Sequence, residues 1–179
     1  VLRDVVPEGT AVSTERALGL IELVLQVLEF AHAQNIVHRD FKPDNVMLLD
    51  LGEKIDRIKL LDFGLAVGTN ATGDDRITRA GSIQGTPLYM SPEQCRGRDV
   101  GPETDVYAVG AVLFELIAGA PPFRGETLAD TLAQQMFMPP PRMSEKGVHP
   151  VTTPAVEALV RAALAKDPKE RPTAAAMRE

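Results

Sequence analysis

Two carboxylates, a carboxamide and a lysine stand close together in the sequence between residues 40 and 62. Asp40 and Asp62 are expected on loops that leave short strands, and Asn45 follows Asp40 by five positions. A carboxylate together with a carboxamide oxygen suits a hard cation such as Mg²⁺, which takes few protein ligands and leaves room for phosphate oxygens. Lys42 adds a positive charge that could neutralise a phosphoryl group in transfer. A single loop Asp is usually a solvated side chain, but this ordered set favours a phosphate-handling site.

The pattern of apolar residues predicts a mostly helical chain with one small hairpin around these side chains. Residues 46–49 and 58–61 are typical of two short strands joined by a turn. Residues 67–86 are rich in Gly, Thr, Asp and Ser, which indicates a long functional loop. Apolar residues recur with helical spacing elsewhere, and helices are expected over 15–34, 104–118, 126–137, 154–165 and from near 172 onward.

Composition limits the classes of protein to which the chain can belong. Its 179 residues suit one domain, and its net charge of -6 argues against nucleic acid or an anionic membrane as the main partner. Cys95 is the single cysteine, so no internal disulfide can form and a reducing cytoplasm is expected. No apolar run is long enough to cross a bilayer. The first residues have neither an initiator Met nor a signal-peptide pattern, so the chain is interpreted as cut from a longer one, whose other parts could carry a membrane anchor.

Several motifs give the chain a resemblance to the protein kinases. Residues 38–45 (HRDFKPDN) resemble the kinase catalytic loop, and 62–64 (DFG) resemble its metal-binding motif. Residues 85–93 (GTPLYMSPE) resemble the end of the activation segment, with Ser-Pro-Glu in place of the usual Ala-Pro-Glu. Residues 105–110 resemble the start of the buried central helix, and 171–172 match the arginine near the domain's end. The motifs follow the family's order along nearly the whole chain.

This resemblance implies a fold and its boundaries. The fold class is α+β: the mainly helical C-terminal lobe of the protein-kinase fold, with a small β-hairpin sheet at the catalytic loops and the N-terminal lobe absent. Residues 1–179 would form a partial kinase domain, with the catalytic loop at 38–45 and the activation segment at 62–93.

The resemblance also implies a role for each residue of the first cluster. Asp40 would accept or orient the proton of the substrate hydroxyl, and Lys42 would stabilise the transferring phosphate. Asn45 and Asp62 would hold two Mg²⁺ ions, or Mn²⁺ in their place, which bridge the phosphates of ATP. Most of the catalysis would come from positioning and charge stabilisation.

Two further residues complete the implied site. Thr86 would hydrogen-bond near Asp40 and Lys42, and Lys42 with Thr86 is the serine/threonine-kinase pattern. Residues 86–94 are most similar to those of bacterial, receptor-associated or soluble serine/threonine kinases. Proteins that carry Ser or Thr would therefore be the substrates. An ordinary turn threonine is the alternative for Thr86. Met47 would pack under the adenine ring, although a strand Met is often plain core.

The resemblance also implies control by phosphorylation through Arg39, beside Asp40, because in the family this arginine pairs with a phosphate on the activation loop and an arginine fork suits a phosphate. Thr78 and Ser82 are favoured as acceptors, with the alternative that loop hydroxyls are merely solvated. The full set of candidate acceptors is Thr69, Thr72, Thr78 and Ser82.

Other residues are expected to have structural roles. His38 and Phe63 would serve packing, and Asp105 would brace the catalytic-loop backbone. Glu93 and Arg171 would form a buried ion pair. No partner or role is expected for His32, His149 and Cys95.

No glycine-rich loop, strand lysine or partner glutamate precedes residue 14, although kinases use all three to hold ATP. The favoured explanation is a fragment of an active serine/threonine kinase that is inactive alone. A pseudokinase-like binding module is the alternative, and a scaffold that docks partners through its later helices is a third. The intact metal and base residues favour the fragment.

Overall fold

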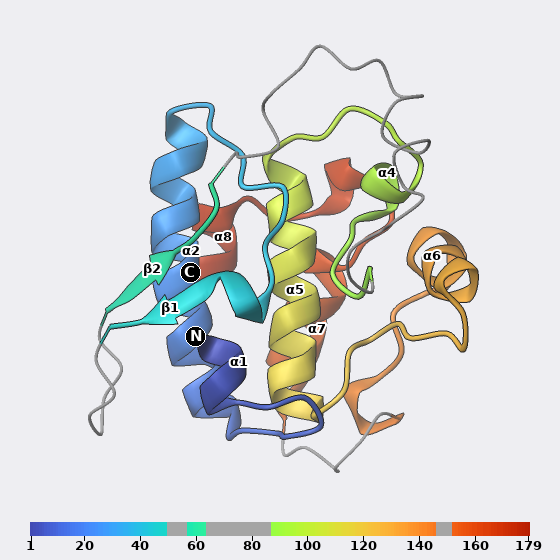
Figure 1. The fold of residues 1–179 in the computed structure, drawn as a ribbon, viewed down its shortest axis with the longest axis horizontal. Helices are drawn as coiled ribbons and strands as arrows, with labels where there is room; N and C mark the ends of the chain where they lie inside the picture. The colour runs from blue at the N-terminus through green and yellow to red at the C-terminus, as the bar shows by residue number, and fades with distance from the viewer. Residues whose placement is uncertain (50–56, 64–86, 146–151) are drawn as a thin grey trace.

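The computed structural model describes residues 1–49, 57–63, 87–145 and 152–179 (Figure 1). Its strands are β1 (Val46–Leu48) and β2 (Ile58–Leu60). Its α-helices are α1 (Leu2–Val5), α2 (Thr14–Ala33), α4 (Pro92–Cys95), α5 (Pro102–Ala118), α6 (Leu128–Phe137), α7 (Pro154–Ala163) and α8 (Ala174–Arg178). Three short 3₁₀ turns are η1 (Pro43–Asn45), η3 (Met143–Glu145) and η4 (Pro168–Glu170).

Helix α5 forms the centre of the fold and is buried from Thr104 to Ala118. A helix that is apolar on all sides must be covered on all sides, and in Figure 1 α5 runs between α2 on one side and α4 and α6 on the other. It begins two residues earlier than the sequence pattern predicts, because Pro102 occupies the first turn, where its missing N–H costs nothing. It ends at Ala118 and is followed by Gly119, whose φ of 76° is left-handed.

Helix α2 packs against α5, α8 and β2. Ser13 caps it by accepting a hydrogen bond from the Arg16 backbone N–H at 3.2 Å. One stripe of α2 is buried, as its periodicity predicts: Ala17, Leu20, Ile21, Val24, Leu25, Leu28 and Ala31.

The two strands form the expected antiparallel hairpin, in which Val46 pairs with Leu60 and Met47 with Lys59. Side chains alternate across the sheet, so Val46 and Leu60 are buried while Met47 and Lys59 are exposed. The strands end at Leu48 and Leu60, one residue short of the predicted ends. Residues 50–56, between the strands, lie outside the described residues.

Of the later helices, α7 packs against α5, α6 against α4 and α8 against α2. The predicted helices over 126–137 and 154–165 are present as α6 and α7, each begun by a threonine cap. Helix α7 comes so close to α5 that a Cβ on Gly110 would lie 2.8 Å from the Ala163 Cβ. Helix α8 starts at Ala174, because Thr173 is its N-cap.

Helix α1 was not expected from the sequence. It spans only Leu2–Val5, which is too short for a periodic pattern, and its Leu2 is buried against the core. It contacts η1 and β1, which carry the cluster around Asn45. Within the described residues, no helix is both long and apolar enough to cross a membrane.

Candidate active site

The backbone of residues 38–39 is held by one buried carboxylate. Asp105, in the first turn of α5, is fully buried and accepts hydrogen bonds from the His38 and Arg39 backbone N–H groups, each at 2.8 Å. This confirms the expectation that Asp105 braces the catalytic-loop backbone. A buried carboxylate that lost these donors would be strongly unfavourable, so the loop and the helix are mutually dependent.

Arg39 and the predicted metal ligand Asp62 have strained backbones. Arg39 has a φ of 70° and Asp62 a φ of 58°, both in the left-handed region that non-glycine residues seldom adopt. Such conformations cost about 1–3 kcal/mol each and persist only where the surroundings impose them. The Arg39 backbone is held at both of its polar groups, since its N–H donates to Asp105 and its carbonyl accepts from Gln94.

His32 has a partner, contrary to the expectation that it would have none. Its Nε2 lies 2.8 Å from Asp105 Oδ2, although the two residues are 73 positions apart. His32 lies near the end of α2, so this contact joins α2 to α5 at the level of the catalytic loop. The sequence has no signal for the pairing, because it depends on how the two helices pack.

Lys42 and Asn45 converge on one oxygen of Asp40. The Lys42 ammonium donates to Asp40 Oδ2 at 2.8 Å, and Asn45 Nδ2 donates to the same oxygen at 3.1 Å. Asn45 Nδ2 also donates to the Asp40 backbone carbonyl at 2.8 Å. The Asp40 side chain remains 62% exposed, so it is open to another molecule. The expectation that Asp40 follows a strand is wrong, because Asp40 lies in the irregular segment that precedes η1 and β1.

These contacts determine which atom of Asn45 is left for a cation. Because both described hydrogen bonds use Nδ2, the carbonyl oxygen Oδ1 makes none with the described residues. Asn45 itself is buried in η1, so its direction is constrained. A carboxamide oxygen held in this way suits Mg²⁺.

Asp62 follows β2 and is kept beside this cluster by main-chain contacts. The Leu61 N–H donates to the Asn45 carbonyl at 2.8 Å, which joins the two loops at the residue before Asp62. The Asp62 side chain is exposed. Its carboxylate and the Asn45 amide therefore fit the donor set of a hard cation, which would take its other ligands from water and phosphate. The described residues contain no group of three His, Cys, Asp or Glu side chains that could hold a metal by themselves.

His38 connects the two loops through its ring as well as by packing. Its Nε2 lies 2.8 Å from the Leu61 carbonyl, and its Nδ1 accepts from the Asp40 N–H at 3.3 Å. A carbonyl only accepts, so Nε2 carries the proton. The Phe63 ring packs edge-on against the imidazole, with centroids 4.7 Å apart, as the packing role predicts.

The remaining predicted residues divide between described and undescribed parts of the chain. Met47 is 38% exposed on β1, so its side chain is open to a ligand. Thr86, the four candidate phosphate acceptors and His149 lie outside the described residues. Arg39 Nε is buried and has no hydrogen-bond partner within the described part of the chain, and its pairing with a phosphate stays a prediction.

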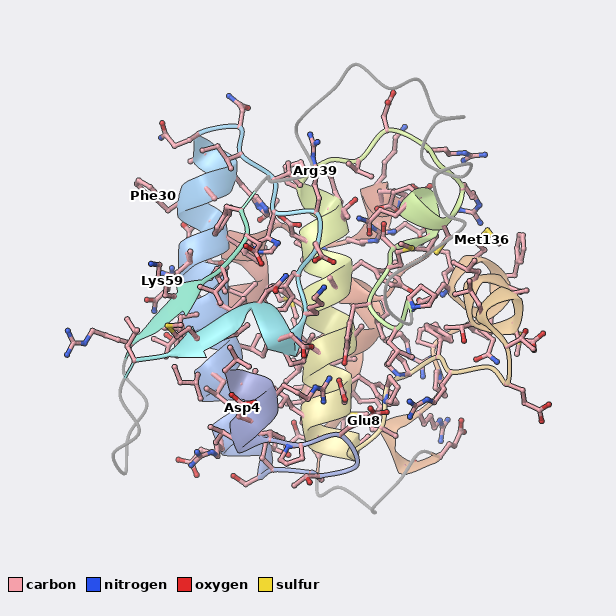
Figure 2. The ribbon with its side chains drawn as sticks, viewed as in Figure 1. Asp4, Glu8, Phe30, Arg39, Lys59 and Met136 are labelled. Carbon is pink, nitrogen blue, oxygen red and sulfur yellow. The ribbon has the colours of Figure 1, made fainter. Side chains whose placement is uncertain are left out.

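A groove of about 670 Å³ runs from Asp40 and Lys42 along the segment Pro87–Met90. Figure 2 shows two of its lining residues, Arg39 and Glu8, near opposite ends of α5. The residues that line the groove carry charges of both signs. Its volume is large enough to hold one or two side chains of an extended peptide. The groove therefore offers an acceptor molecule a path to Asp40.

One wall of this groove contains a polar cluster that the sequence did not predict. Arg3 donates to Glu115 Oε1 at 2.9 Å and also to the Tyr89 hydroxyl, which in turn donates to Glu115. Burial and the adjacent Glu115 raise the pKa of Tyr89, so its phenol stays protonated and can donate. The signal in the sequence was an acidic residue within the apolar stretch that follows Asp105 in α5, since Glu115 lies there.

The expected buried ion pair between Glu93 and Arg171 is confirmed. Arg171 Nη1 and Nη2 donate to the two Glu93 oxygens at 2.7 and 2.8 Å. Thr104 donates to Glu93 at 2.8 Å, and Gln94, next along α4, donates to the Arg39 carbonyl at 2.6 Å. Helix α4 is thereby joined to both the catalytic loop and the C-terminal segment.

Comparison with known proteins agrees with this geometry. The protein kinase domain model matches residues 1–179. The serine/threonine-protein kinase PknB of Mycolicibacterium smegmatis is 39% identical over 178 residues, which cover 99% of this chain and 27% of that protein. The serine/threonine-protein kinase pkn3 of Myxococcus xanthus is 38% identical over 161 residues, which cover 89% of this chain and 29% of that protein. The chain thus spans less than a third of the length of these relatives.

The fold also agrees with a solved structure. Rad53 1-466, in complex with AMP-PNP, superposes with a TM-score of 0.75 at 23% identity, covering 99% of this chain and 42% of that chain. The family model matches from the first residue to the last, and the fold is that of a kinase. The chain therefore belongs to the protein kinase domain family.

Proposed function

We propose that the chain is the larger, C-terminal lobe of a serine/threonine protein kinase domain, which transfers the γ-phosphate of ATP to Ser and Thr hydroxyls of proteins. One observation carries this proposal: Lys42 and Asn45 both donate to Asp40 Oδ2. Among the described residues, no hydrogen bond reaches Oδ1 of Asp40, which leaves that oxygen for an acceptor hydroxyl. The similar proteins PknB and pkn3 are serine/threonine-protein kinases, which supports the same activity.

In this mechanism Asp40 orients the acceptor hydroxyl for attack on the γ-phosphate and accepts the proton of that hydroxyl. Lys42, held against Asp40, contributes a positive charge next to the transferring phosphate. Asn45 Oδ1 and the Asp62 carboxylate are the atoms that would hold Mg²⁺. Ions held there would supply positive charge to neutralise the phosphates of ATP. Because the chemistry needs little besides position and charge, the hydrogen bonds that orient Asp40 are the main contribution of these residues.

The nucleotide itself would rest against β1. Three large apolar side chains on or near β1 are partly exposed: Val5 at 39%, Met47 at 38% and Leu49 at 54%. Grouped exposed apolar side chains commonly mark a binding surface. We assign this face to the adenine ring and to the N-terminal lobe that kinases place above it, and we expect the 179 residues alone to be inactive or nearly so. A cytoplasmic site, where ATP and reduced cysteine are both available, suits this activity.

The test uses the full-length protein and radiolabelled ATP with Mg²⁺. Wild type should label Ser and Thr of a general kinase substrate, and Asp40→Asn should lose about 10²-fold or more of that rate with ATP still bound. Asp99→Asn, an identical change at an exposed position outside the site, is the control and should keep wild-type activity. Folded wild-type protein that labels nothing would instead support the pseudokinase-like binding module.

A further inference from the structure

Gln135 is a polar residue with no exposed surface, and the kinase motifs do not include it. It lies in α6, which packs against α4, and its relative exposure is 0%. A buried amide is stable only if its donors and acceptor are all paired. Its hydrogen bonds therefore show what the residue holds in place.

The Gln135 amide holds two consecutive backbone carbonyls. Its Nε2 donates to the Pro87 carbonyl at 3.1 Å and to the Leu88 carbonyl at 2.8 Å. Its Oε1 accepts from the Tyr107 hydroxyl at 2.5 Å. Both N–H donors and the acceptor of this one side chain are thus in use, so the amide cannot rotate without losing all of them.

The two backbone carbonyls set the direction of these bonds. A carbonyl only accepts, so the amide nitrogen of Gln135 faces Pro87 and Leu88, and Gln135 Oε1 accepts the proton of the Tyr107 hydroxyl. The Lys166 side chain completes the cluster by donating to the Tyr107 hydroxyl at 3.1 Å and to the Gln135 backbone carbonyl at 2.7 Å.

The two carbonyls belong to the wall of the groove described above. Pro87 and Leu88 line it together with Asp40 and Lys42. The Met90 N–H also reaches the Pro87 carbonyl, at 3.4 Å, which makes Pro87–Met90 a turn anchored at its first residue. The position of this turn relative to Asp40 sets where an acceptor peptide can lie.

We propose that Gln135 is a positioning residue for the protein acceptor, which acts through the Pro87 and Leu88 carbonyls and has no part in ATP binding. The proposal rests on the proposed function, because it concerns how an acceptor reaches Asp40. It places the control of acceptor affinity in α6, across the core from the catalytic loop.

The experiment compares Gln135→Glu with Gln134→Glu in the full-length protein. The first change turns the donor that faces two carbonyls into an acceptor. The second makes the same chemical change one position away, where Gln134 Oε1 accepts from the Arg124 N–H at 3.1 Å and Glu can still accept. Gln135→Glu should raise KM for a peptide acceptor about tenfold while KM for ATP stays within about twofold. Gln134→Glu should change neither.

Equal changes in both KM values, or no change in either, would overturn the proposal, since a merely structural role predicts no selective effect on the acceptor. If Gln135→Glu does not fold, Tyr107→Phe replaces it, because Phe removes only the hydrogen bond to Gln135 Oε1 and the bond from Lys166. A rise of about threefold in acceptor KM is then expected, and an unchanged value counts against the proposal.

Amide hydrogen exchange separates this proposal from the activity. Gln135→Glu should speed the exchange of the Leu88–Met90 amides, and Gln134→Glu should not. Full-length wild type that transfers no phosphate would refute the proposed function, whereas the exchange result would still decide whether Gln135 holds this turn. Unchanged exchange in a folded Gln135→Glu protein would refute the positioning role.

Discussion

Arg171 and Glu93 form two parallel hydrogen bonds although they are 78 positions apart in the sequence. Arg171 also donates to the Ala165 and Glu103 carbonyls, at 2.8 and 2.9 Å. Its guanidinium stacks over the Tyr107 ring, 4.9 Å from the centroid. The planar fork of arginine suits this arrangement, which an ammonium could not reproduce. One side chain therefore ties α4, the start of α5 and the C-terminal segment together.

Replacing Arg171 by Met should destabilise the domain strongly. The change leaves the Glu93 carboxylate buried without its counter-charge, and such a loss costs about 3–5 kcal/mol. Arg178→Met is the matched control, because Arg178 pairs with Glu29 at 2.7 Å on the exposed surface, where an ion pair contributes about 1 kcal/mol or less. Urea unfolding of the domain within the full-length protein measures both. If both changes lowered the free energy of unfolding equally, burial of the Glu93–Arg171 pair would have no effect on stability.

Glu93 should make the domain sensitive to acid. Burial raises the pKa of Glu93, but hydrogen bonds and charge from Arg171 outweigh it and lower the pKa to about 2, from an ordinary 4.5. The ionised carboxylate therefore stabilises the fold above about pH 4.5, and this contribution is lost as the pH falls from 4.5 towards 2. The stability difference between wild type and Glu93→Gln should shrink over that range. A difference independent of pH would contradict the assignment, and Glu29→Gln serves as the exposed control.

Asp105→Asn should lower kcat more than it weakens ATP binding. One of the two backbone N–H groups, of His38 or Arg39, would then face an amide N–H instead of a carboxylate oxygen. Misplacing a catalytic loop by about 1 Å can lower the rate about 10²-fold. We expect kcat to fall by that order while KM for ATP changes little, with Asp99→Asn unaffected. Turnover equal to wild type would show that the loop holds its shape without Asp105.

Lys166 should make stability rise with pH above neutrality. Burial is the main cause that lowers the pKa of Lys166 to about 7 from 10.5, and the charges of Arg171 and Arg96 lower it further against the opposing effect of Cys95. Between about pH 7 and 10.5 the unfolded chain binds a proton that the folded domain does not, so the free energy of unfolding increases with pH. Lys166→Met should flatten this dependence, whereas the exposed Lys169→Met should leave it intact. A pH dependence that survives in Lys166→Met would refute this origin.

Local patterns were enough to predict the parts of the site that lie close together in sequence. Asp40, Lys42 and Asn45 fall within one short loop, and their mutual contacts follow from that proximity. Periodicity located α2, because burial of one face repeats the apolar residues at helical spacing. A strongly apolar run closed by Gly119 and Pro121-Pro122 located α5, which is buried on all faces. The Glu93–Arg171 pair was predictable only through the resemblance to kinases.

Tertiary structure alone decided the contacts between distant residues. His32 gained Asp105 as a partner because α2 packs against α5. Gln135 gained Pro87 and Leu88 because α6 packs next to α4 and the turn that precedes it. Such pairings produce no periodic pattern in the sequence. A single polar residue does not indicate whether its hydrogen-bond partner is water or a distant backbone group. The sequence by itself determined the chemistry available at residues 40–62. The packing of α5 and α6 decided which other side chains hold that chemistry in position, since a buried polar group must find its hydrogen-bond partner within the fold.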